Sequence, residues 1–370
     1  MAIPIQNPGL SPAFQNARLP FRGKPIPRQG TEPGRAETAR RRSLRTWLPL
    51  IDVINLALPY FGLIFIGFAC GKLKNIPHTA LAWMDFFIFY VSLPALFYRI
   101  LAQTPLEQLA QLPFIAATTL ATAAAFLVSV GIGLAFHPRR LREAAIAGLA
   151  GGYGNIGYMG PGLALATLGG GAAVPVALIF CFDNIILFSM VPLLMAIAAP
   201  GRRGIGSIAA EVGKRIVLHP LLVASALGVV SATLHVRLPA ALDRLLEFLQ
   251  AAAAPTALFT LGVTVALRPL TRVPVEILPL AVVKLILHPA LALVLVLLLG
   301  PFDPVWIATA VLMAALPPAL NVFVFARQYD AWIEEASSAV LFGTLASVVT
   351  LTTVMWLVKA GALPLDLFGR

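Results

Sequence analysis

Hydrophobic residues in this chain occur in long runs rather than in the short alternation typical of barrel strands. Each run lasts about 20 residues, the length that a helix needs to cross a bilayer. Charged residues, Pro and Gly separate the runs. The pattern predicts an all-α membrane protein with ten transmembrane helices, in the ranges 50–71, 79–101, 113–136, 144–168, 172–199, 216–234, 241–267, 275–299, 304–326 and 333–359.

Two of these ten windows are interrupted. Residues 151–162 in the fourth window are rich in Gly, and residues 316–321 in the ninth window contain a Pro pair. In hydrocarbon, a backbone group that a break frees finds no water, so irregular backbone persists only where it is buried in protein or lines a cavity. Paired breaks at matching places in two halves indicate the binding site of a secondary transporter.

The two halves of the chain also resemble each other outside the breaks. Leu93-Pro94-Ala95-Leu96-Phe97 in the second window is similar to Ala254-Pro255-Thr256-Ala257-Leu258-Phe259 in the seventh. Each half holds five windows, an odd number, so the second half must enter the membrane in the opposite orientation. We therefore predict two inverted five-helix repeats, residues 49–200 and 216–370, joined by a cytoplasmic linker at 201–215.

Composition and charge agree with a membrane protein and add an orientation. Hydrophobic residues make up 59% of the 370 positions and charged residues only 12%, against about 25% charged in soluble domains. Twelve Lys or Arg lie in the odd-numbered connections and three in the even-numbered ones. Under the positive-inside rule, the odd connections are cytoplasmic and both termini are outside.

Residues 1–48 conflict with that orientation. They carry nine Lys or Arg against two Glu, directly before the first window, where they should hold the chain end in the cytoplasm. The segment has too few apolar residues to bury a core, so we predict a disordered basic tail. A true start further along the chain remains the alternative.

The two breaks hold no acid or base, and their chemistry is that of amides and hydroxyls. Asn155 and Asn321 supply amide groups, and Tyr153 and Tyr158 supply hydroxyls. The N-terminal end of a half-helix after a break carries partial positive charge and favours a carboxylate. The sequence therefore predicts a small organic anion bound by these four residues.

Ionisable residues inside the windows form a second set of candidates. An Asp or Lys at the bilayer centre costs about 2.5–3.5 kcal/mol on insertion scales, so these side chains should face protein or water. Lys284 and His288 are four residues apart and share a helix face. Coupling to protons or cations is one interpretation, and mutual neutralisation of charge is the other. The ionisable residues are Asp85, Asp183, Lys284 and His288, and the amide of Asn184 adjoins Asp183.

Several classes of function find no support. The chain has no phosphate-binding loop, no nucleophile elbow, no zinc-protease motif and no Cys/His cluster. We therefore predict a protein that is not an enzyme, with no cofactor and no metal. Its expected partners are the anion and the lipid bilayer, with no nucleic acid, and a homodimer is left open. Cys70 and Cys181 lie in apolar windows and should be free thiols.

At the two breaks the chain resembles the auxin efflux carrier family, which includes plant PIN-type carriers and bacterial permeases for malate- and malonate-like acids. The resemblance covers about residues 50–360. Its specific part is Gly154-Asn155-Ile156-Gly157-Tyr158-Met159-Gly160-Pro161 together with Leu316-Pro317-Pro318-Ala319-Leu320-Asn321 and Phe323-Val324-Phe325-Ala326-Arg327-Gln328-Tyr329. Lys284 with Pro289, and Leu93-Pro94-Ala95, add weaker matches.

The resemblance implies a ten-helix inverted repeat, like that of bile acid symporters and antiporters, in which helices 4 and 9 cross. The crossover residues would be Gly160, Pro161, Pro317 and Pro318. A scaffold made largely of helices 1, 2, 6 and 7 would stay fixed while the rest slides past it as an elevator. Asn155 and Asn321 would flank the substrate. The family commonly has proline where this chain has Gly162, which leaves the register of that kink open.

The sequence thus predicts a secondary transporter of a mono- or dicarboxylate, a multi-pass protein of the inner (plasma) membrane. One alternative is a proton- or sodium-coupled symporter or antiporter of the same fold for another solute. Related antiporters usually carry carboxylates at the crossover, and this chain has none there. A non-transporting membrane receptor is the alternative from another class.

Overall fold

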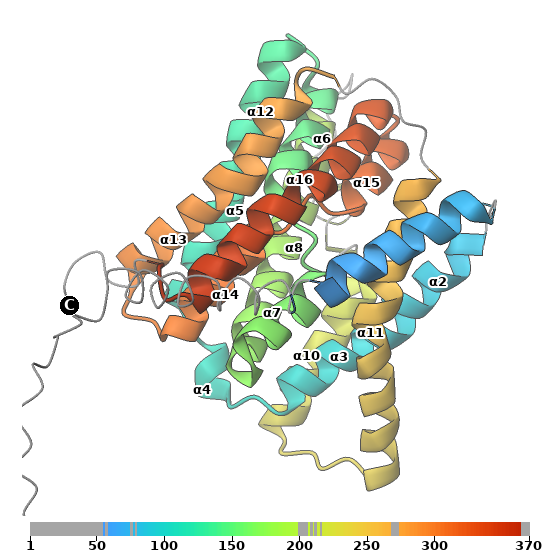
Figure 1. Ribbon diagram of the computed structural model, residues 1–370. Helices are drawn as coiled ribbons and strands as arrows, with labels where there is room; N and C mark the ends of the chain where they lie inside the picture. Colours follow the sequence, from blue (N-terminus) through green and yellow to red (C-terminus); the bar gives the residue numbers. More distant parts are fainter. Residues whose placement is uncertain are drawn as a thin grey trace, which may run out of the picture. The chain divides into compact units, whose positions relative to one another are not determined.

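The computed structural model describes residues 58–74, 80–198, 217–267 and 274–363, with isolated positions at 55, 77, 206, 207, 210, 213 and 214. The predicted basic tail at 1–48 lies outside these residues, as does most of the predicted linker at 201–215. Within the described ranges all regular elements are helices, and a single isolated β-bridge joins two of the irregular segments (Figure 1).

A helix or a pair of helices lies in each of the ten predicted ranges. The first half contains the helix Leu58–Leu73, α2 (Leu81–Phe87), the π-helical turn η2 (Ile88–Ser92), α3 (Leu93–Ala102), α4 (Leu106–Leu109), α5 (Leu112–Phe136), α6 (Leu141–Gly152), α7 (Gly160–Leu168), the 3-10 turn η3 (Gly170–Ala172) and α8 (Ala173–Ala198). The second half contains α10 (Pro220–Thr233), α11 (Ala240–Ala266), α12 (Ile277–Val282), the π-helical turn η4 (Val283–Leu287), α13 (His288–Leu299), α14 (Pro304–Ala314), α15 (Asn321–Tyr329) and α16 (Ile333–Lys359).

Six helical stretches in the described ranges are long and apolar enough to cross a membrane. They are Leu81–Ala102, Glu107–Phe136, Gly170–Ala198, Ala240–Ala266, Ile277–Leu299 and Ile333–Lys359. By contrast, α6, α7, α14 and α15 have 12, 9, 11 and 9 residues. At 1.5 Å per residue, each of these four is about half the length that a bilayer core of about 30 Å requires.

Proline starts many of the helices. It occupies the first or second position of α5, α7, α10 and α14, at Pro113, Pro161, Pro220 and Pro304. There its missing N–H is not needed and its fixed φ already suits the helix. The start of α14 is also capped, because the Asp303 side chain accepts a hydrogen bond from the backbone N–H of Val305 at 2.8 Å.

The helices pack in two groups. The first, here called the α3 group, contains the helix Leu58–Leu73, α2, η2, α3, α10 and α11. Glycine allows the close contact inside it: a Cβ on Gly67 would lie 2.2 Å from the carbonyl O of Phe259, and a Cβ on Gly262 would lie 2.0 Å from that of Ile64. The helix Leu58–Leu73 and α11 therefore meet backbone to backbone.

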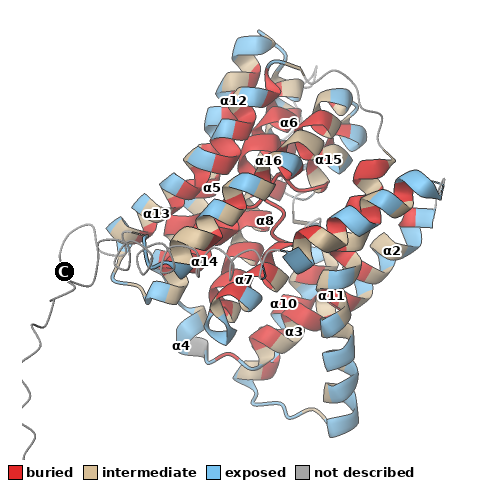
Figure 2. Ribbon diagram, in the orientation of Figure 1, coloured by how far each residue is buried: buried red, intermediate tan, exposed pale blue. Residues whose placement is uncertain are grey.

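The second group, here called the α5 group, contains α5 to α8 and α12 to α16. Here α6 lies directly on α5, since a Cβ on Gly151 would lie 1.8 Å from Ser129 Oγ. Figure 2 shows α6 and α8 mostly as buried, whereas outward faces of α12 and α13 are exposed. Large apolar side chains such as Leu127, Ile286 and Leu298 lie on exposed faces, which suits contact with lipid.

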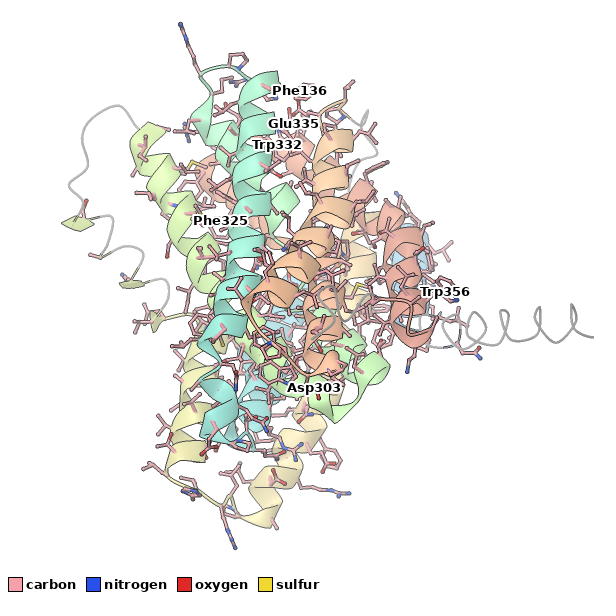
Figure 3. All side chains as sticks on the ribbon, turned by 90° about the vertical axis from the view of Figure 1, so that its left-hand side faces the viewer. Phe136, Asp303, Phe325, Trp332, Glu335 and Trp356 are labelled. Carbon is pink, nitrogen blue, oxygen red and sulfur yellow. The ribbon has the colours of Figure 1, made fainter. Side chains whose placement is uncertain are left out.

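The α14–α15 pair runs the length of the α5 group. Figure 3 places Asp303, which caps the start of α14, at one end and Trp332, which follows α15, at the other, near Phe136 at the end of α5. The chain therefore runs from one end of the group to the other through α14 and α15, and the break between the two half-helices lies inside the group.

Candidate functional site

The first break separates α6 from α7. Gly151 and Gly152 are poor helix formers, and Tyr153 leaves the helix with φ −93° and ψ 100°. The helical conformation resumes at Gly160, with Pro161 as the second residue of α7. The segment between, residues 153–159, includes the predicted substrate residues of this half.

The second break separates α14 from α15. Pro317 and Pro318 carry no N–H and cannot extend the i→i−4 ladder of α14, which ends at Ala314. The next helix begins at Asn321, so this predicted substrate residue is the first residue of a half-helix.

The two breaks pair with each other through the backbone. The N–H of Asn155 donates to the carbonyl O of Pro317 at 2.8 Å, and the N–H of Ala319 donates to that of Tyr153 at 2.9 Å. These bonds form an antiparallel bridge between Gly154 and Pro318. Backbone groups that the breaks would leave without partners are thereby satisfied inside the protein.

The predicted crossover residues divide around this bridge. Pro317 and Pro318 take part in it, whereas Gly160 and Pro161 lie further along, in the first turn of α7. Gly160 packs against the end of α14, because a Cβ there would lie 2.8 Å from the Sδ of Met313. The backbone pairing is thus centred on Gly154 rather than on Pro161.

Helix α16 packs closely against Pro318 of the bridge. A Cβ on Gly343 would lie 2.4 Å from Cδ of Pro318. Overpacking of this kind costs about 1–3 kcal/mol, so Gly343→Val should lower the thermal unfolding midpoint in detergent. The matched control is Gly131→Val in α5, where an added Cβ would meet nothing within 4 Å. Equal midpoints for the two variants would show that α16 does not press on the bridge.

Three of the predicted residues form one chain of polar contacts. The side-chain amide of Asn321 donates to the Tyr153 hydroxyl at 3.0 Å, and that hydroxyl donates to Asn184 Oδ1 at 2.5 Å. The contacts join α15, the first break and α8. Tyr153 and Asn184 are both buried, so the chain lies inside the protein and fixes the orientation of each group.

Asn155 is placed differently. Its side-chain Oδ1 accepts from the backbone N–H of Tyr158 at 3.3 Å, while its Nδ2 is buried and has no hydrogen-bond partner among the described residues. A buried donor without an acceptor costs about 1–3 kcal/mol and calls for an explanation. The side chain of Tyr158 reaches the other way and donates to Asp85 Oδ1 at 3.3 Å.

A small cavity lies between these groups. The four predicted substrate residues and Asn184 line it from the α5 group, and Phe89, His219 and Leu221 line it from the α3 group. Its volume is about 10 Å³, room for about one water molecule. The sequence predictions omitted His219, which directly precedes the first residue of α10, Pro220.

The remaining predicted residues lie outside the cavity lining. Asp85, on α2, reaches it only through Tyr158. Lys284 and His288 contact each other at 3.0 Å, as their spacing predicts, but within the described residues no direct ion pair joins Lys284 to Asp85 or Asp183. Lys284 lies in η4, and π-helical turns are frequent at functional sites.

Among the described residues, no three His, Cys, Asp or Glu side chains cluster as metal ligands would. Cys70 and Cys181 are free thiols.

A multi-span helical protein in which two broken helices meet at a buried polar site has the form of a secondary transporter. The comparison with known families agrees: residues 52–355 match the family described as membrane transport protein. The chain belongs to this family, the auxin efflux carrier family of transporters.

The individual relatives are also named as transporters or carriers. A protein of Rhizobium meliloti (strain 1021) named "Putative malonate transporter" is 46% identical over 319 residues, which are 86% of this chain and all of the relative. Auxin efflux carrier component 8 of Arabidopsis thaliana is 29% identical over 37% of this chain and 39% of its own length. Auxin efflux carrier component 5 of the same plant is 32% identical over 32% and 34%.

Family and helices together establish a multi-span transporter of the inner membrane. The prediction of family and location from the sequence is confirmed.

Proposed function

We propose that this protein is a secondary carrier of a small organic anion, a mono- or dicarboxylate, and that the anion binds where the two broken helices pair. The observation that carries the proposal is the buried side-chain amide of Asn155, whose Nδ2 has no acceptor among the described residues. A carboxylate oxygen entering the cavity beside it would provide that acceptor.

The electrostatics of the site favour an anion. Helices α7 and α15 both begin at the breaks, so their partially positive N-terminal ends face this region. Lys284 lies directly behind the first break, where a Cβ on Gly154 would be 3.2 Å from its Nζ. Asn, Tyr and His supply the polar side chains of the cavity lining, and none of its residues is an acid.

The identity of the substrate is narrowed by the relatives. The relative named for malonate matches along its whole length, so a malonate-sized dicarboxylate is the first candidate. The present cavity, about 10 Å³, is smaller than such a molecule, because that volume holds about one water. Binding therefore requires the α3 and α5 groups to separate at the site.

The division into two groups supports an elevator movement. The α3 group consists of the predicted helices 1, 2, 6 and 7, which the family resemblance assigns to the scaffold. Polar contacts between the groups near the site are few among the described residues: Tyr60 Oη donates to the carbonyl O of Gly162 at 2.9 Å, and Tyr158 Oη donates to Asp85 at 3.3 Å. We infer that the α5 group carries the anion past the α3 group.

We propose that ten transmembrane helices form two inverted repeats, with α6–α7 and α14–α15 as the broken fourth and ninth helices. The matching positions of the two breaks and their antiparallel pairing support this arrangement.

Counterflow in proteoliposomes tests the proposal. Vesicles loaded with unlabelled malonate, malate or indole-3-acetate are diluted into the same labelled acid. A carrier exchanges at least one of them faster than protein-free vesicles do. Exchange of none of the three acids would contradict the anion carrier, and binding of an acid without its exchange would favour the receptor.

A further inference from the structure

A second polar cluster, separate from the cavity, lies inside the α5 group. Lys284 Nζ is 3.0 Å from His288 Nδ1, and His288 Nε2 is 3.1 Å from Thr122 Oγ1. Thr122 in turn donates to Asp183 Oδ2 at 2.8 Å. All four side chains are buried, with at most 4% of each residue exposed. The cluster joins η4, α13, α5 and α8 through three consecutive hydrogen bonds.

The hydrogen bonds of this cluster fit a charged lysine at one end and an ionised carboxylate at the other. With Lys284 as an ammonium, which can only donate, Nδ1 of His288 accepts and Nε2 carries the hydrogen. That hydrogen bonds to Thr122, whose own hydroxyl donates to the Asp183 carboxylate. The chain of bonds therefore runs from a charged lysine through a neutral imidazole and a hydroxyl to an ionised carboxylate, with net charge zero.

One end of the cluster contacts the paired breaks, and the other end lies next in sequence to a residue that contacts the first break. At one end, Lys284 also donates to the carbonyl O of Ala314, the last residue of α14, and lies against Gly154, which lines the cavity. At the other end, Asp183 is followed by Asn184, which accepts from the Tyr153 hydroxyl. A change of charge in the cluster therefore changes the electrostatic potential where the anion would bind.

One oxygen atom of the cluster lacks a hydrogen-bond donor. Asp183 Oδ1 is buried and has no hydrogen-bond partner among the described residues. A buried oxygen of a charged carboxylate without a donor is unfavourable. Protonation of this carboxyl group removes the charge that burial disfavours.

We propose that this cluster takes up one proton in each transport cycle and that the protein is a proton–anion symporter. The inference rests on the proposed function. A proton from solvent adds to Asp183 Oδ1 and leaves Lys284 as an unbalanced positive charge beside Gly154. An anion in the cavity restores neutrality, so proton and anion each strengthen the binding of the other. Both are released on the far side, and no other bond changes.

Other titratable groups face the same region and define the competing explanations. Tyr153 lines the cavity and donates to Asn184, the residue after Asp183, while Asp85 and His219 approach from the α3 group. His219 is the strongest competitor, because its ring lines the cavity and its Nδ1 is buried without a partner among the described residues. Lys284 and Asp183 could also serve only to balance each other's charge.

The experiment uses proteoliposomes with a pH dye inside and malonate added outside, for the full chain and for Asp183→Asn. In the native protein, malonate entry should acidify the lumen, and an outside-acid gradient should drive accumulation. Asp183→Asn mimics the protonated carboxyl group. It should retain malonate counterflow but lose both acidification and gradient-driven accumulation. Protein-free vesicles correct for permeation of the undissociated acid.

Each other outcome contradicts the inference. Counterflow by the native protein without proton movement overturns symport while leaving the anion carrier intact. Absence of counterflow of malonate, malate and indole-3-acetate by the native protein overturns both the symport and the anion carrier. Acidification by Asp183→Asn at the native rate, or loss of coupling in His219→Gln with coupling retained in Asp183→Asn, removes the role of the cluster.

A second pair of variants covers a failure of Asp183→Asn to fold. Thr122→Val keeps the shape of the side chain but breaks the bonds to Asp183 and His288, whereas Thr122→Ser keeps the hydroxyl. The valine variant should change the pH dependence of counterflow, and the serine variant should retain the native profile. Identical profiles for the two would overturn the relay.

Discussion

Replacing Asn321 by Ala is expected to lower the efficiency of anion uptake by about 10- to 150-fold, because a hydrogen bond to a charged group contributes about 1.5–3 kcal/mol. The amide of Asn321 also orients the Tyr153 hydroxyl at 3.0 Å, and the substitution releases that group. Initial uptake rates over a range of concentrations in proteoliposomes measure the effect. Asn155→Ala should show a loss of the same order.

The control for these variants is Gln103→Ala, which removes an amide from an exposed position. It should transport as the native protein does. The amount of each variant in the membrane must be equal, so that a low rate reports on the site. Native uptake by both Asn155→Ala and Asn321→Ala would disprove the assignment of the site to the paired breaks.

The second large effect is on stability. Lys284→Met should lower the free energy of unfolding by about 1–3 kcal/mol for each buried hydrogen-bond partner that loses its donor. The substitution takes the donor from the Ala314 carbonyl and from His288, and it leaves Asp183 without a compensating cation. Thermal unfolding in detergent, followed by the loss of monodisperse protein, gives the comparison with the native chain.

Two variants sharpen that measurement. Lys359→Met removes an exposed lysine at the end of α16 and should unfold at the native temperature. Lys284→Met combined with Asp183→Asn removes both charges, so it should recover part of the loss. A Lys284→Met protein as stable as Lys359→Met would mean that the ammonium does not hold the crossover together.

The sequence indicated most of the helices because hydrophobic run length is a local property. Each predicted window contains a helix or a pair of helices in the described residues. The breaks were also predictable, since Gly151-Gly152 and Pro317-Pro318 disfavour a continuing helix wherever they occur. The contact between Lys284 and His288 followed from their spacing of four residues.

Other features depend on contacts between distant segments, which spacing does not reveal. The pairing of Gly154 with Pro318 requires two breaks to meet in register. Thr122 is one more small residue in an apolar window of the sequence, yet in the structure it lies between His288 and Asp183. His219 was missed because a His-Pro pair at a helix start carries no sign of facing a cavity.

Direct binding tests the central claim, that an organic anion binds at the paired breaks. The measurement is the equilibrium binding of labelled malonate to the purified protein, native and Asn155→Ala, at one pH. We predict saturable binding by the native protein and a dissociation constant raised about 10-fold or more in the variant. Saturable binding with the same dissociation constant in both proteins would place the anion elsewhere and contradict the account.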